Sequence, residues 1–80
     1  VAHEINNPTT FTHGNLTYAR NYTKDLLALL DIYQQSYPEP AEGVADFLGA
    51  IDIGFIIEDL PKTLASMQIG ADRIRQIVAS

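Results

Sequence analysis

The feature that most constrains the fold is the spacing of apolar residues, which alternates between steps of four and three along much of the chain. Such spacing places side chains along one face of an α-helix and is typical of coiled coils and helical bundles. The sequence therefore predicts an all-α chain whose helices pack through long apolar stripes, and we expect these stripes to form the core. The alternation is strict toward the C-terminus, where it runs through Leu60, Leu64, Met67, Ala71, Ile74 and Val78.

An N-terminal stripe with the same spacing predicts a first helix over about 2–36. Pro38-Glu39-Pro40 should end this helix and begin a loop over 37–41, because proline cannot continue a helix and disfavours helical backbone in the preceding residue. Pro8 lies within the stripe, and we expect it to bend the helix just after His3 rather than to end it. The stripe runs through Ile5, Thr9, Thr12, Leu16, Ala19, Thr23, Leu26, Leu30, Tyr33 and Tyr37.

Apolar spacing in the second half predicts a helical segment over about 42–58 and a final helix over about 60–80. Asp59 is the expected cap of the final helix, with Pro61 in the first turn, where its missing N–H costs little. Asp52 offers an alternative cap for a helix start.

Helix lengths suggest how these segments pack. A first helix of about 35 residues spans about 52 Å, whereas a final helix of about 20 residues spans about 30 Å. We therefore expect residues 42–58 to run back antiparallel to the first helix, with the second arm kinked or broken near 52–61. This path forms an antiparallel helical hairpin and brings Ile74 to Val78 beside Ile5.

Size and charge narrow the possible partners. Eighty residues form one domain, 1–80, and a monomer this small buries too little apolar surface to be comfortably stable, so we expect two hairpins to dimerise into a four-helix bundle. Ten acidic residues against five basic ones give a net charge of −5, which disfavours nucleic acid. The chain has no cysteine and no apolar run of about 20 residues, so we expect no disulfide and no direct membrane insertion.

Candidate chemistry lies in the first eight residues. If this segment is helical, Ile5 joins the apolar stripe, and His3 and Asn7 share an exposed face because they are four residues apart. Glu4 follows His3 directly and could orient or deprotonate one imidazole nitrogen while the other attacks an electrophile. The pattern favours a nucleophilic histidine with a carboxylate beside it.

The segment from His3 to Pro8, His-Glu-Ile-Asn-Asn-Pro, resembles the H-box of sensor histidine kinases. A weaker likeness covers Gly70 to Val78, which is similar to the end of the second helix in the dimerisation and histidine-phosphotransfer domain of these kinases. Glu58 to Lys62 is similar to a segment of kinases with a long insertion between the two helices. Together these segments span nearly the whole chain.

The resemblance implies a role for each residue of the motif. His3 would accept the γ-phosphoryl group of ATP and pass it to an aspartate of a response-regulator receiver domain. Glu4 would act as base or orienter of His3, and Asn7 would position the phosphoryl group or a hydrolytic water. The chain would be a cytoplasmic homodimer, with or without a membrane anchor elsewhere in the parent protein.

The resemblance also implies that this chain is a fragment of a protein-histidine kinase and is not active alone. It has no glycine-rich phosphate loop and no room for a nucleotide fold, so we expect it to bind no cofactor itself. ATP and Mg²⁺ would be brought by a separate catalytic domain, expected beyond Ser80 in the parent protein.

Three other functions are possible alternatives to a histidine kinase domain. A bundle used only for oligomerisation or signal connection would dimerise without phosphotransfer. A monomeric histidine-phosphotransfer domain would need a self-contained four-helix bundle, for which the predicted helices are too few. A His-Glu-x-x-His zinc site is disfavoured because its fifth position is Asn7, so we expect no metal.

Three further residues have open or minor roles. His13 is a rival nucleophile, but it lies off the face of His3 and has no carboxylate next to it in the sequence. Arg73 and Arg75 could contact a nucleotide-binding or receiver domain, or could be solvated charges near a helix C-terminus.

Overall fold

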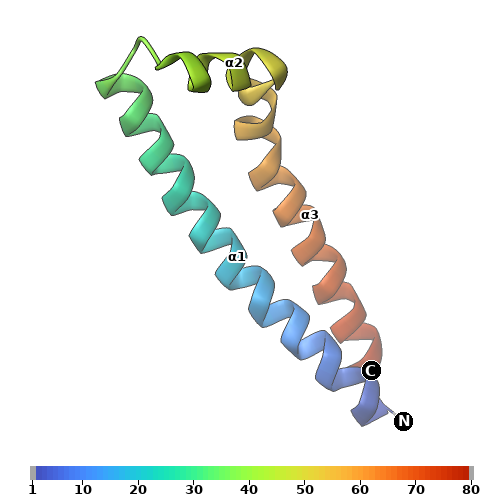
Figure 1. Cartoon of the computed structure of the whole chain (residues 1–80). Coiled ribbons are helices and arrows are strands. Elements are labelled where there is room, and N and C mark those ends of the chain that lie inside the picture. Colours follow the sequence, from blue (N-terminus) through green and yellow to red (C-terminus); the bar gives the residue numbers. More distant parts are fainter. Residues whose placement is uncertain (1, 80) are drawn as a thin grey trace.

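The computed structural model describes the backbone of residues 2–79 and the side chains from Pro8 to Ala79. This part of the chain is all-helical and contains no strand. It consists of α1 (Ala2–Ser36), α2 (Glu42–Ala50) and α3 (Ile53–Ala79), shown in Figure 1. The all-α prediction is therefore confirmed.

Helix α1 has the bounds expected from its apolar stripe. Pro8 lies inside the helix, and the hydroxyl of Thr12 donates a hydrogen bond to the Pro8 carbonyl at 2.9 Å. The helix ends at Ser36, and the N–H of Tyr37 still donates to the carbonyl of Tyr33 at 2.8 Å. Pro8 thus does not end the helix, and a bend at this position stays a prediction.

The second half corrects the predicted helix bounds. Helix α2 ends at Ala50, and α3 begins at Ile53 rather than near residue 60. The cap is Asp52, whose carboxylate accepts a hydrogen bond from the N–H of Phe55 at 3.1 Å. The break therefore lies at Ile51 and Asp52, at the N-terminal edge of the predicted range.

Asp59 and Pro61 do not mark a helix start, because both lie within α3. Asp59 accepts a hydrogen bond from the hydroxyl of Thr63 at 2.9 Å, so its carboxylate serves a contact within the helix. Pro61 has no backbone N–H, so one carbonyl of the preceding turn lacks its helical hydrogen bond. The helix nevertheless continues past Pro61.

Helices α1 and α3 lie side by side and run in opposite directions, with α2 across one end (Figure 1). Cross-helix contacts give the alignment: His13 contacts Asp72, and Thr17 contacts Gln68. A step of four residues forward in α1 is thus matched by a step of four residues back in α3.

The expected antiparallel path along α1 is wrong for residues 42–50, which form α2, whereas residues 53–58 belong to α3 and run antiparallel to α1. With 27 residues, α3 spans about 40 Å and accompanies most of α1 without help. Helix α2 instead crosses between the ends of α1 and α3 that lie farther apart in Figure 1.

The core of the single chain is small. Among the described side chains, the buried apolar residues are Leu16 and Ala71, at 7% and 6% exposure. They lie on the facing sides of α1 and α3, close to the cross-helix contacts. Most other large apolar side chains are exposed, including Leu26, which the apolar stripe had placed in the core.

Candidate functional site

The residues of the predicted phosphoacceptor motif lie in the first two turns of α1. The backbone of His3, Glu4 and Asn7 is helical. Their side chains lie outside the described residues, so the geometry expected for the motif stays a prediction.

The second histidine, His13, contacts a carboxylate that sequence adjacency had not suggested. Nδ1 of His13 lies 2.6 Å from Oδ1 of Asp72, across the interface between α1 and α3. This nitrogen is shielded from solvent, yet the contact is not a hydrogen bond of normal geometry. Both side chains remain partly exposed at the edge of the interface.

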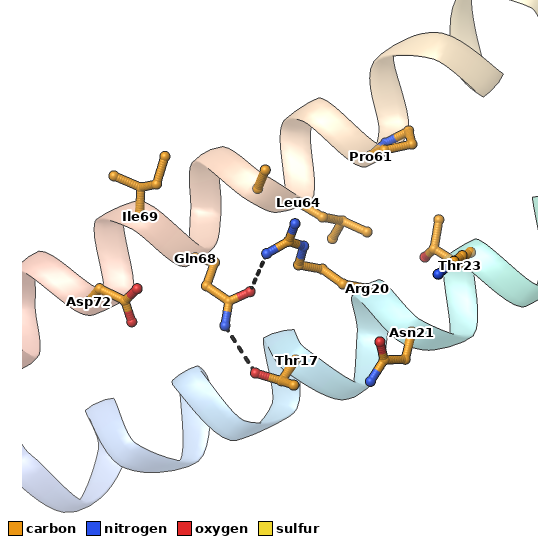
Figure 2. Close-up of a pocket in the computed structure, with 11 residues that line it drawn as sticks. Thr17, Arg20, Asn21, Thr23, Pro61, Leu64, Gln68, Ile69 and Asp72 are labelled. Atoms are coloured by element: carbon orange, nitrogen blue, oxygen red, sulfur yellow. Dashed lines mark hydrogen bonds between the residues drawn. The ribbon is translucent and has the colours of Figure 1, made fainter.

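Three polar side chains form a second link between the same helices, one turn further along (Figure 2). The amide nitrogen of Gln68 donates to the hydroxyl oxygen of Thr17 at 2.9 Å, and its amide oxygen accepts from Arg20 at 2.8 Å. The Thr17 hydroxyl donates in turn to the carbonyl of His13 at 3.2 Å. We call these residues together with His13 and Asp72 the polar seam.

An open groove of about 880 Å³ lies along the polar seam, between α1 and α3. Thr17, the lining residue of α1 nearest the N-terminus, is 14 residues from His3, or about 21 Å along the helix. The groove is therefore separate from the predicted phosphoacceptor site. It is lined by Thr17, Arg20, Asn21, Thr23, Lys24, Pro61, Leu64, Ala65, Gln68, Ile69 and Asp72.

The groove does not have the composition of a nucleophilic or metal site. Its two cations are Arg20, which is bound to Gln68, and the exposed Lys24, and Asp72 contacts His13. Among the side chains from Pro8 to Ala79, no group of three or more histidine or carboxylate side chains could hold a metal ion. We therefore interpret the groove as the solvated polar face of the helix pair.

Many of the exposed apolar residues of α1 and α3 lie on the opposite face, as helical rotation shows. At about 100° per residue, Thr17 and Arg20 fall on one side of the buried Leu16, while Tyr22 and Leu26 fall on the other. The same rotation applied to α3 places its side chains on one side or the other of the buried Ala71. Gln68 and Asp72 fall on one side, and Met67 and Ile74 fall on the other.

The groove is lined by polar side chains of α1 and by both polar and apolar side chains of α3, among them Gln68 and Asp72. The sides of the two helices that carry Tyr22, Leu26, Met67 and Ile74 therefore share the face away from the groove. We call this surface the apolar face. It contains Phe11, Tyr18, Tyr22, Leu26, Leu29 and Tyr33 of α1 and Ile56, Leu60, Met67, Ile74 and Ile77 of α3, all exposed in the single chain.

The remaining predictions concern Met67 and Ile74, which were expected in the core, and Arg73 and Arg75, which could contact another domain. Met67 and Ile74 are about half exposed, so they are not core residues of the single chain. Arg73 is exposed, whereas Arg75 is half-buried, three residues from Asp72. Neither has a contact that distinguishes a docking role from a solvated charge.

The comparisons with known proteins do not identify a relative. No protein-family model matches the chain, and no curated protein or solved structure matches it. In the described residues, no helix combines the length and apolar character that crossing a membrane requires.

Proposed function

We propose that this chain is the dimerisation and histidine-phosphotransfer domain of a sensor histidine kinase. The observation that carries the proposal is that α1 runs unbroken from Ala2 past Pro8, so the His-Glu-Ile-Asn-Asn-Pro motif lies on a helix. A helix keeps His3 and Asn7 four residues apart on one face, as the motif requires. The proposal places the chain in the cytoplasm.

The assembly we propose is a homodimer in which two apolar faces pack together. A compact protein of 8.8 kDa exposes about 4,800 Å² of surface, whereas this chain exposes 6409 Å². The excess of about 1,600 Å² is twice the roughly 800 Å² that each partner buries in a standard interface. The single chain thus has enough uncovered surface for a stable dimer.

A second copy of the chain is the partner that best fits this surface. From residue 8 onward, the α1 side of the apolar face carries no charged side chain. Packing it against the same face of another copy would form a four-helix bundle around α1 and α3 of both chains. The polar seams would remain on the outside, where the net charge of each chain is solvated.

Within this dimer, the proposed chemistry is transfer of a phosphoryl group. One ring nitrogen of His3 would attack the γ-phosphorus of ATP, and the bond between that phosphorus and the ADP oxygen would break. Glu4 would hold or take the proton on the other ring nitrogen, and Asn7 would position the phosphoryl group. The phosphoryl group would then pass to a carboxylate oxygen of a receiver-domain aspartate.

ATP and Mg²⁺ would come with a separate catalytic domain. We therefore expect the isolated chain to be a substrate and not a kinase.

The experiment is phosphorylation of the chain with labelled ATP and an added histidine kinase catalytic domain. We expect an acid-labile label on the unmodified chain and on His13→Gln, and none on His3→Ala. The two variants are matched because each removes one of the two histidines of the chain. A label that survives His3→Ala would contradict the assignment.

A bundle used only for oligomerisation is the second candidate, because the apolar face supports it equally well. It predicts a dimer of normal stability that takes up no label from any histidine kinase catalytic domain. Measuring the mass in solution together with the label separates the two functions, and a stable monomer would contradict both.

A further inference from the structure

We propose that an apolar pocket between the end of α1 and α2 is a docking site for a cationic amphipathic helix of another protein. We call it the loop pocket, and it lies at the end of the molecule where α2 crosses (Figure 1). Leu30, its lining residue nearest His3 in the sequence, is 27 residues away, or about 40 Å along α1. Docking here is therefore independent of the proposed phosphotransfer. The pocket is lined by Leu30, Tyr33, Gln34, Tyr37, Pro38, Glu39, Pro40, Ala41, Val44 and Leu48.

The lining of the loop pocket is mainly apolar, unlike that of the groove along the polar seam. Apart from the tyrosine hydroxyls, its polar side chains are those of Gln34 and Glu39, and its open volume is about 670 Å³. The rings of Tyr33 and Tyr37 stack with their centroids 6.0 Å apart, so they form a continuous aromatic wall. The two prolines of the loop restrict its backbone, which favours a pocket that is formed before a partner binds.

The single chain leaves this pocket uncovered. No residue of α2 is buried, and Tyr37 and Val44 are 67% and 54% exposed. Val44 and Leu48 are four residues apart, so they line the pocket from one side of α2. Helix α2 has nine residues and spans about 13 Å, which matches about two turns of a partner helix. Such a helix would insert two or three apolar side chains.

The charge around the pocket favours a cationic partner. Residues 25–61 contain eight acidic side chains and no lysine or arginine, whereas the rest of the chain has two acidic and five basic ones. Among the described side chains, Glu58 is the one member of the eight that forms an ion pair, with Lys62 at 3.3 Å. The remaining charge attracts lysine and arginine and repels anionic lipid and nucleic acid. The eight are Asp25, Asp31, Glu39, Glu42, Asp46, Asp52, Glu58 and Asp59.

A second copy of this chain fits the pocket less well than a cationic helix does. Two loop ends brought together would each carry the same eight acidic side chains and would repel each other. Tyr33 is the one lining residue that also belongs to the apolar face. The homodimer proposed above would therefore leave most of the loop pocket uncovered.

The test measures binding of a labelled helical peptide of about 14 residues to the full chain by fluorescence anisotropy. Its leucines are spaced three and four residues apart, and lysine fills the other positions. One matched peptide has glutamate in place of every lysine. A second keeps the lysine and leucine content in an order that forms no apolar face.

Four variants of the chain locate the binding site. Val44→Asn and Glu39→Gln alter the lining of the loop pocket. Ile69→Asn is matched to the first, because Ile69 is similarly exposed, at 59%, and lies on α3 along the polar seam. Asp46→Asn is matched to the second, because Asp46 is an exposed carboxylate about 200° around α2 from Val44.

We expect the lysine–leucine peptide to bind most tightly, and to bind more weakly as the salt concentration rises. Val44→Asn should weaken its binding about 5- to 10-fold, because an apolar contact is lost. Glu39→Gln should weaken it about 2- to 3-fold, because one attractive charge is lost. Ile69→Asn and Asp46→Asn should each have a smaller effect than the variant to which they are matched.

Four outcomes would overturn the inference. Equal binding of the peptide without an apolar face, or an unchanged affinity of Val44→Asn, would mean attraction by charge alone. Equal binding of the glutamate peptide would mean that the charge does not select the partner. Binding of the chain to phosphatidylcholine vesicles that Val44→Asn abolishes would make lipid the occupant. Dissociation of the homodimer by the peptide, with a dimer equally weakened by Val44→Asn in sedimentation equilibrium, would make a second copy the occupant.

Discussion

The two faces of the α1–α3 pair differ in how far their side chains are contacted by other residues of the single chain. On the polar seam, side chains of the two helices contact each other directly, as Gln68 does with Thr17 and Arg20. On the apolar face, Met67 and Ile74 are about half exposed to solvent. The polar seam lies within the single chain, whereas the apolar face is uncovered in it and would be covered only in the homodimer proposed above.

We expect the largest effect when a charge is placed on the apolar face. Met67→Glu should raise the dimer dissociation constant by at least about 100-fold, because each copy would bury an unpaired carboxylate. Ile69→Glu is the matched control, since Ile69 is 59% exposed against 51% for Met67 and lines the groove on the opposite face. Sedimentation equilibrium measures both variants, and equal dissociation constants would refute the assignment of faces.

A smaller effect should distinguish the interface between α1 and α3 from the proposed dimer interface. Leu16→Ala should lower the free energy of unfolding by about 2 to 3 kcal/mol, because Leu16 is buried within the single chain. Leu26→Ala should act mainly on the dimer, since Leu26 is 66% exposed in the single chain. Denaturant unfolding over a range of protein concentrations separates these contributions. A larger effect of Leu26→Ala on the dissociated chain would contradict the structure.

The start of α3 can be tested through its cap. Asp52→Ala should cost about 1 kcal/mol, because the N–H of Phe55 loses its acceptor. Asp59→Ala should cost only a few tenths of a kcal/mol, since it removes an exposed contact with Thr63 inside the helix. Denaturant unfolding gives both values, and the reverse order would place the helix start near Asp59 instead.

The smallest expected effect is on the polar seam. Gln68→Ala removes two hydrogen bonds between α1 and α3, and should cost about 0.5 to 1 kcal/mol because the seam is partly solvated. Gln76→Ala, at an exposed position of the same helix, is the control. Thermal unfolding can resolve the difference, and identical Tm values would mean that the seam adds nothing to stability.

Local sequence signals were sufficient for α1 but not for α3. The bounds of α1 follow from apolar spacing and from Pro38-Glu39-Pro40, which act within a few residues. The start of α3 was missed because Asp52 and Asp59 carry the same capping signal, and Pro61 appeared to support the second. The hydrogen bond from Phe55 to Asp52 decides between them.

The faces of the helices could not be derived from spacing alone. A stripe with alternating steps of four and three spans a broad arc of a helix, so it included both the buried Ala71 and the half-exposed Met67. Which edge of the stripe turns inward depends on the alignment of α1 against α3. The same alignment brings His13 to Asp72, a pairing that no local pattern contains. The roles of His3, Glu4 and Asn7 rest on the resemblance and stay predictions.

The central claim, that His3 is the phosphoacceptor, is tested most directly by mapping the phosphorylated residue. The unmodified chain is phosphorylated with ATP and a histidine kinase catalytic domain, then digested at neutral pH or above and sequenced by fragmentation mass spectrometry. We predict that the phosphoryl group is found on His3 and not on His13. A phosphoryl group found only on His13, or on a hydroxyl side chain, would contradict the assignment.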